Sequence, residues 1–201
     1  ATRLLALVPL PNLPGLGTNF DQNTVRKKDS DSFDIKVDHQ HSSAAKISVR
    51  YSFLRPVTTD PAPAAYGLAG GPHGGGFIGT GTDRTQSAAI IYDHLFSPTL
   101  IAEARIGVSR YRNDAQSMDY GTNASDAIGI RGVNVSAFTS GMTGIVIGGY
   151  GSPLVGYSAS LPWVRSETNF NWANVWTTTR SNHTMKWGVD IRRIRDDLLQ
   201  N

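Results

Sequence analysis

The chain has 201 residues with a formal net charge of +3, and 39% of its residues are hydrophobic. It contains no cysteine, which excludes thiol catalysis, thiolate metal sites and disulfides. No uninterrupted apolar stretch reaches the roughly 18 residues that a spanning helix needs, so a helical membrane protein is excluded. Basic residues are scattered among acidic ones instead of forming a stripe, so nucleic acid is not an expected partner.

We expect residues 1–30 to form an irregular lead-in segment. Their apolar part, Leu4–Leu10, is short, and prolines follow it where a secretory signal would have a small-residue cleavage site. The segment also lacks an initiating methionine. We expect either a processed chain or a fragment whose export signal lay upstream.

Period-two alternation then predicts a first hairpin at about residues 31–55. Phe33, Ile35 and Val37 share one face of the first strand, with charged residues between them. The returning strand repeats the pattern from Ile47 to Phe53. A short polar segment at residues 39–44 joins the two strands.

The same pattern predicts two more hairpins, at about 86–113 and 164–195. In the second hairpin, residues 96–99 form the turn, and the polar face carries charges of both signs. In the third, the apolar face is strongly aromatic and the turn lies at residues 180–183. The high glycine content, 21 residues, agrees with an all-β chain rich in turns.

Short turns within the hairpins contrast with long connections between them, at about 55–85 and 113–164. Loops beyond about 12–15 residues are uncommon in compact soluble domains. Outer-membrane barrels combine tight periplasmic turns with long outer loops, and their tilted strands need about 9–11 residues. The sequence therefore predicts an all-β fold in which antiparallel amphipathic hairpins, about six strands in residues 31–201, form part of a transmembrane β-barrel wall in the bacterial outer membrane.

The alternation assigns side chains to two faces of that wall. Aromatic residues near the strand ends are typical of the belts at a membrane boundary, and opposite charges on neighbouring strands suit a hydrated interior. The expected lipid-facing and girdle residues are Tyr51, Phe53, Tyr92, Phe96, Trp172, Trp176 and Trp187. The expected lumen-facing residues are Asp34, Lys36, Asp38, Arg50, Glu103, Arg105, Lys186, Asp190 and Arg192.

Several segments, in order, resemble the barrel region of Oar-like TonB-dependent receptors. They are Leu4–Asn12, Asp31–His39, Ile47–Ser52, Tyr92–Leu100, Glu103–Gly107, Leu161–Trp163 and Asn182–Arg193. Each motif by itself is mostly the alternating polar and apolar pattern of an amphipathic strand. Their order and spacing make the match specific.

The resemblance implies a many-stranded barrel, closed by an N-terminal plug, that imports a scarce solute with energy from the TonB system. The expected partners are outer-membrane lipid, the rest of the parent barrel and plug, and the TonB system through the parent. The plug and the energy-coupling box are not in this sequence. No ligand-contacting residue can be transferred to a numbered position, so the solute stays open.

No enzyme, metal site or cofactor is expected. His39 and His41 lie two apart in a predicted turn with no third metal ligand nearby in sequence. The serine in Gly149–Pro153 is followed by proline and does not form a nucleophile elbow. The glycine-rich stretch Gly70–Gly76 has no lysine and fails as a phosphate loop, and we expect a flexible outer loop there. Glu103 and Asp190 are more simply explained as hydrated wall residues than as an acid–base pair.

Two alternatives remain open at this level. Period-two alternation also fits a soluble β-rich carbohydrate-binding module, with Trp163, Trp172 and Tyr150 as stacking platforms and a second sheet packed on the first. Unpaired strand edges would also allow a self-assembling module. The two alternatives and the barrel differ in what covers the apolar face.

Overall fold

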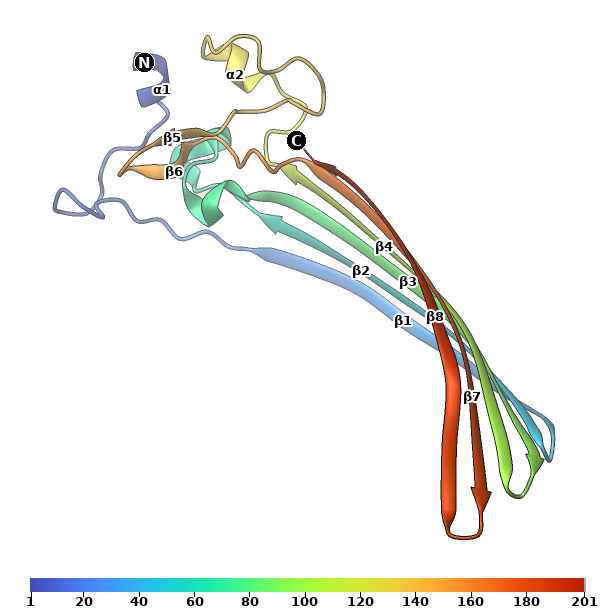
Figure 1. Ribbon diagram of the computed structural model, residues 1–201. Helices are drawn as coiled ribbons and strands as arrows, with labels where there is room; N and C mark the ends of the chain where they lie inside the picture. Colours follow the sequence, from blue (N-terminus) through green and yellow to red (C-terminus); the bar gives the residue numbers. More distant parts are fainter. Residues whose placement is uncertain (201) are drawn as a thin grey trace.

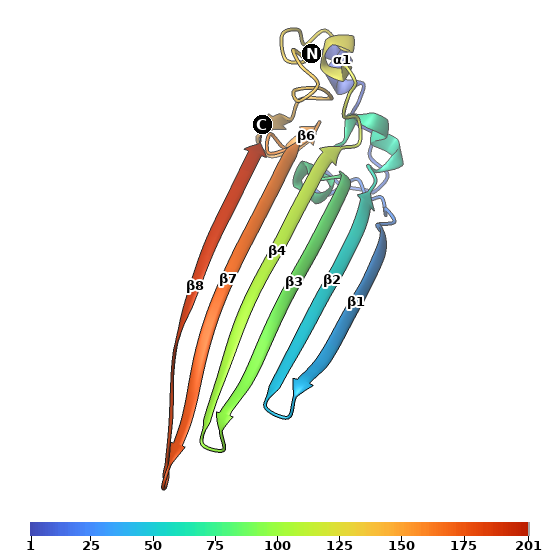
Figure 2. The same cartoon turned by 90° about the vertical axis from the view of Figure 1, so that its right-hand side faces the viewer.

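The computed structural model describes residues 1–200, and its main feature is one long antiparallel sheet (Figure 1). Six strands lie side by side in the order β1-β2-β3-β4-β7-β8 (Figure 2). They comprise β1 (Lys27–Ser42), β2 (Ala45–Asp60), β3 (Gly79–Ser97), β4 (Leu100–Ser117), β7 (Trp163–Arg180) and β8 (His183–Gln200). The all-β antiparallel fold expected from the alternation is therefore present.

Each hairpin is longer than its sequence pattern predicted. The alternation placed the first hairpin at about 31–55, whereas β1 and β2 extend from Lys27 to Asp60. The second and third hairpins similarly run over residues 79–117 and 163–200 instead of 86–113 and 164–195. Charged residues occupy both faces of the added segments, so the alternation of apolar and polar residues fades there while strand pairing continues.

The turns at one end of the sheet are tight. Residues 43–44, 98–99 and 181–182 join consecutive strands, and Ser181 takes a left-handed conformation with φ of 53°. At about 3.3 Å per residue, strands of 16 to 19 residues are roughly 50–60 Å long. The strands are therefore longer than the roughly 9–11 residues that a tilted membrane strand needs.

The opposite end of the sheet carries a folded cap, which we define as residues 61–78 and 118–162 together with the lead-in, residues 1–26 (Figure 1). It contains α1 (Thr2–Leu5), the 3-10 turns η1 (Ala64–Ala69) and η2 (His73–Gly76), and α2 (Ala124–Ala127). It also contains a two-stranded sheet of β5 (Ile145–Ile147) and β6 (Gly151–Val155).

The main apolar core lies in this cap and not beneath the large sheet. Ile78 and Val155 are fully buried, and Tyr157 is 4% exposed. They pack with Ala69, Met142 and Leu154, and Leu4, Leu7 and Val8 of the lead-in lie against this cluster. The lead-in, expected to be irregular through residue 30, thus contributes to the cap and ends where β1 begins at Lys27.

The glycine-rich stretch was expected to be a flexible loop, and the structure corrects this. Gly70 and Gly76 both have a φ of +82°, and a Cβ at either position would lie 2.6 Å from a backbone atom, Gly156 O or Ser158 N. Glycine is therefore required at both positions because the loops pack backbone against backbone. The amide of Gly156 donates to Ala69 O at 2.6 Å, which joins the two loops.

Candidate functional site

In the half of the sheet nearest the tight turns, one face is apolar and the other is polar. Antiparallel register places one residue from each strand in a row across the sheet. The middle row of one face is apolar at all six positions. It consists of Val37, Val49, Ile90, Ile106, Trp172 and Ile191.

We call this side the apolar face, and it is uncovered within residues 1–200. Val37 is 59% exposed and Ile106 is 61% exposed. The second sheet, β5 and β6, belongs to the cap and packs with its core. No described element therefore covers the apolar face, contrary to what the soluble module would require.

All seven residues expected to face lipid lie on the apolar face. Trp176 lies opposite Trp187 near the tight turns, and Phe96 stacks on Trp176 with ring centroids 5.3 Å apart. Tyr51 and Phe53 lie at the other margin, where Phe33 stacks on Phe53 at 5.3 Å, and Tyr92 lies one row above His94 and Trp176. Trp172 does not lie near a strand end, where a girdle residue would lie. It occupies the middle row, between Ile106 and Ile191.

The apolar band runs obliquely across the hydrogen-bonded rows. On β1 it reaches Phe33, but on β8 it ends at Ile191, and Arg193 already occupies the row of Ile35 and Tyr51. At the turn end it descends to Met185 on β8. An oblique band results when strands are tilted against a flat apolar layer, as in closed membrane barrels.

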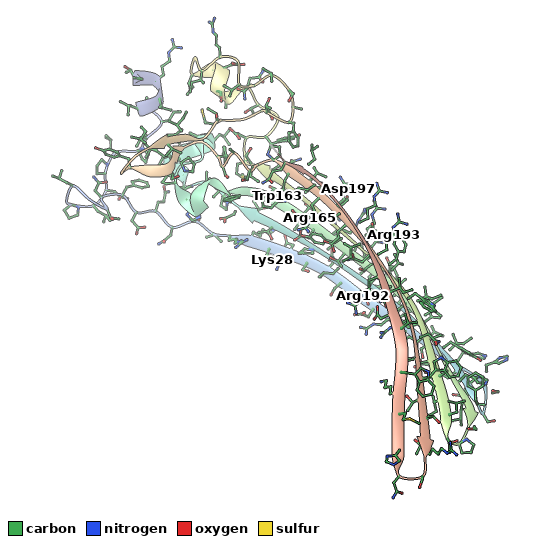
Figure 3. The ribbon with its side chains drawn as sticks, in the orientation of Figure 1. Lys28, Trp163, Arg165, Arg192, Arg193 and Asp197 are labelled. Atoms are coloured by element: carbon green, nitrogen blue, oxygen red, sulfur yellow. The ribbon has the colours of Figure 1, made fainter. Side chains whose placement is uncertain are left out.

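The nine residues expected to face the lumen all lie on the opposite, polar face. Figure 3 shows the two sides at adjacent positions of β8, where Arg192 and Arg193 point away from each other. Arg50 donates to Asp34 at 3.0 Å across β1 and β2, and Lys36 pairs with Asp38 at 2.9 Å. Asn171 and Arg192 both donate to Asp190. The charge pairing expected between the first two strands is therefore present.

The remaining predicted lumen residues complete this face. Glu103 lies opposite Asp93, whose other neighbour is Lys46, and Lys186 lies opposite Thr177. Arg105 sits between Ile91 and Ala173. Its Nε atom is buried and has no hydrogen-bond partner among the described residues, and the same holds for Oδ1 of Asn169. These two polar atoms are therefore enclosed by the surrounding side chains without a hydrogen-bond partner.

Sequence reasoning missed a second polar cluster, higher on the same face. Tyr111 donates to Asp83 at 3.0 Å, Asn113 also donates to Asp83, and the indole of Trp163 donates to Asn113. Arg165 donates to Asp196 at 2.8 Å. The alternation could have found it, because Tyr111, Asn113 and Arg165 lie on the polar face within the predicted hairpins. Asp83, Trp163 and Asp196 continue the same alternation just beyond the predicted strand ends.

A pocket of about 340 Å³ lies between this cluster and the cap. Phe77 of the cap lies 6.1 Å from Trp163, measured between ring centroids, and the cap backbone at Ser160 accepts a hydrogen bond from Gln200. We call this cavity the upper pocket. Its lining includes Arg26, Asp60, Phe77, Asp83, Asn113 and Trp163.

The three aromatic residues of the carbohydrate alternative do not meet. Trp163 lines the upper pocket, whereas Trp172 lies on the apolar face and Tyr150 is 77% exposed in the cap. The histidines are likewise spread out. His39 and His41 lie with ring centroids 6.2 Å apart, while His73 contacts Thr24 and Asp60. Within residues 1–200 no three His, Asp or Glu side chains are grouped as metal ligands.

The cap contains one buried carboxylate. Asp119 is 1% exposed and accepts a hydrogen bond from the amide of Met142 at 2.5 Å, while its Oδ1 atom has no partner among the described residues. Burial raises the pKa of Asp119. Burial, together with the nearby Asp119, also raises the pKa of the Tyr157 hydroxyl. Removal of this carboxyl group from water disfavours its charged form.

The long tilted strands, the oblique apolar band and the polar opposite face together define the wall of a transmembrane β-barrel. No helix in residues 1–200 is long and apolar enough to cross a membrane. Residues 1–201 match the family described as outer membrane beta barrel domain, and the chain belongs to that family. The protein is therefore located in the bacterial outer membrane. No curated protein and no solved structure matches the chain.

Proposed function

We propose that this chain forms part of the wall of a TonB-dependent receptor that takes up a solute with energy supplied through the TonB system. The observation that carries the proposal is the charged and open polar face below a folded cap, where the ion-paired side chains of Arg50 and Asp34 are 61% and 58% exposed. Such a face suits a hydrated barrel interior, which a plug or a passing solute can contact. The resemblance to Oar-like receptors supports the same function.

In this proposal the apolar face meets lipid and the polar face meets the hydrated barrel interior. The tight turns then lie on the periplasmic side and the cap lies outside the cell. Strands β1 and β8 each pair on one side only within residues 1–200, and both need a neighbouring strand. The proposed partners are therefore outer-membrane lipid, further barrel strands, a plug and, through the parent protein, the TonB system.

The upper pocket is the proposed place of first contact with the solute. It lies where the cap meets the upper polar face, and it combines the rings of Phe77 and Trp163 with the polar groups of Asp83 and Asn113. Ligand pockets commonly pair apolar walls with a few fixed polar groups. The proposed role is transport and not catalysis, and it requires no cofactor and no nucleic acid.

The orientation of the two faces can be tested by fluorescence quenching. Variants that retain a single tryptophan, Trp172 or Trp163, would be reconstituted in vesicles containing brominated lipid. We expect strong quenching of Trp172 by the lipid and of Trp163 by aqueous iodide, because the two rings lie on opposite faces. Equal quenching of both by lipid would contradict the orientation.

Transport can be tested in the host. Strains lacking the gene, or lacking TonB, would be compared on ferric siderophores, cobalamin, maltodextrins and peptides. We expect both deletions to abolish uptake of the same solute, and the variant Trp163→Ala to weaken uptake while Trp172→Phe does not. Uptake that persists without TonB would contradict the energised mechanism, and the barrel assignment would stand.

A further inference from the structure

Three arginines lie side by side on the apolar face, above its apolar band. Arg84 on β3 lies directly opposite Arg112 on β4. Arg55 on β2 follows the register between the pairs Leu54–Thr85 and Val57–Thr82, which places it opposite Arg84. The three side chains line a hollow of about 380 Å³ together with Phe53, Thr82 and Asp114. Three neighbouring strands therefore each contribute one guanidinium group to the same recess.

This arrangement carries more positive charge than its neighbours neutralise. Arg112 donates to Asp114 at 2.8 Å, but Arg55 and Arg84 make no ion pair within 4.0 Å to any described residue. Asp31 lies opposite Arg55 on β1 without reaching that distance. Like charges directly opposite each other destabilise a sheet, so the row favours an anion from outside the chain.

The position of the hollow indicates where that anion lies. Phe33 and Phe53, one row below, are the last apolar residues of the band on β1 and β2. One row corresponds to two residues, or about 7 Å along a strand. The arginines lie on the cap side of the band, which in an outer-membrane barrel is the outer leaflet. Their height therefore matches lipid headgroups and not acyl chains.

We propose that this hollow binds the phosphate group of a phosphorylated lipid of the outer leaflet. Guanidinium groups hold phosphate through paired N–H donors, and basic recesses at headgroup depth are suited to anionic lipids. The stacked rings of Phe33 and Phe53 contact the apolar part of the same lipid. The inference rests on the orientation in the proposed function, with the apolar face toward lipid, but not on transport.

The test uses the intact protein, purified in detergent and supplied with lipid A that carries two phosphates. Native mass spectrometry would count the retained lipid for the wild type and for the variant Arg84→Gln/Arg112→Gln. We expect the wild type to bind at least about tenfold more tightly than the variant, because charge-assisted phosphate contacts are lost. Arg131→Gln removes a charge from an exposed cap position and should bind like the wild type.

Further measurements complete the test. Dephosphorylated lipid A should bind the wild type as weakly as phosphorylated lipid A binds the double variant. The variant Arg84→Lys/Arg112→Gln should recover part of the affinity that the double variant loses. The heat-modifiable gel shift would confirm that each variant is folded. Equal binding by the wild type and the folded double variant would overturn the proposal, and so would complete displacement by inorganic phosphate, which would indicate a free-anion site. Uptake of the solute by the double variant should be unchanged. The binding assay therefore tests the lipid site, and the uptake assay tests transport, so each proposal can fail without the other.

Discussion

The six-stranded sheet and the cap bury their side chains in opposite ways. The buried residues of the long strands are small, such as Ala45, Ala102 and Ala173, whereas their large apolar residues are exposed. In the cap the large residues Ile78, Val155 and Tyr157 are enclosed. The cap encloses its large apolar side chains within its own core. The sheet leaves them exposed, and in the proposed orientation lipid covers them.

Truncation in the cap core should have the largest effect. For Ile78→Ala we expect a loss of about 2–5 kcal/mol of cap stability, because the fully buried side chain leaves a cavity. Hydrogen exchange of the cap amides would measure it, and Leu68→Ala, at a 61% exposed position of the same loop, is the matched control. Equal effects at the two positions would remove the contrast between cap and sheet.

A charge placed in the middle of the apolar band should have the next largest effect. Ile106→Lys should destabilise the protein in vesicles by about 2–4 kcal/mol, the cost of a cation near the bilayer midplane. Reversible urea unfolding in vesicles would measure this. Ser109→Lys, on the polar face of the same strand, should change stability much less, and a comparable loss there would argue against the two-faced wall.

Asp119 should make the cap sensitive to pH and to truncation. Asp119→Ala should cost about 1–3 kcal/mol, because the buried amide of Met142 loses its acceptor. Asp119→Asn keeps an acceptor and removes the charge. A carboxyl group whose pKa is raised by folding stabilises the folded state when protonated, and this contribution is lost as the pH rises through the raised pKa.

The pH dependence therefore has a defined sign. The stability of the wild type relative to Asp119→Asn should increase as the pH falls from 7 through the raised pKa, and it should level off below 3.8, the ordinary value for an aspartate. Hydrogen exchange of the cap at several pH values would measure the difference. A flat difference across this range would show that burial does not perturb Asp119.

The smallest effect is expected at the ion pair of Arg50 and Asp34. Their side chains are 61% and 58% exposed, so water solvates both charges in the folded and the unfolded protein. Arg50→Gln should leave the urea midpoint unchanged within error, measured beside Ile106→Lys. A large loss would mean that the polar face is dry and tightly packed against another part of the barrel.

Much of the sheet could be predicted from sequence because alternation is a local property. The parity of Phe33, Ile35 and Val37 assigned those side chains to one face before any contact was known, and the structure keeps them there. The strand ends could not be predicted in this way. Arg84 and Arg112 lie on the same face as Ile90 and Ile106. A charged residue on this otherwise apolar face interrupts the alternation of apolar and polar residues, so the pattern no longer marks a strand there.

The sequence by itself determined the antiparallel hairpins, the two chemically different faces and the placement of all sixteen predicted wall residues on them, since each depends on neighbours within a few positions. Only the tertiary structure decided that the long loops form a packed cap, that Phe77 meets Trp163, and that Arg55, Arg84 and Arg112 share a hollow. These contacts join residues far apart along the chain, and no local period encodes them.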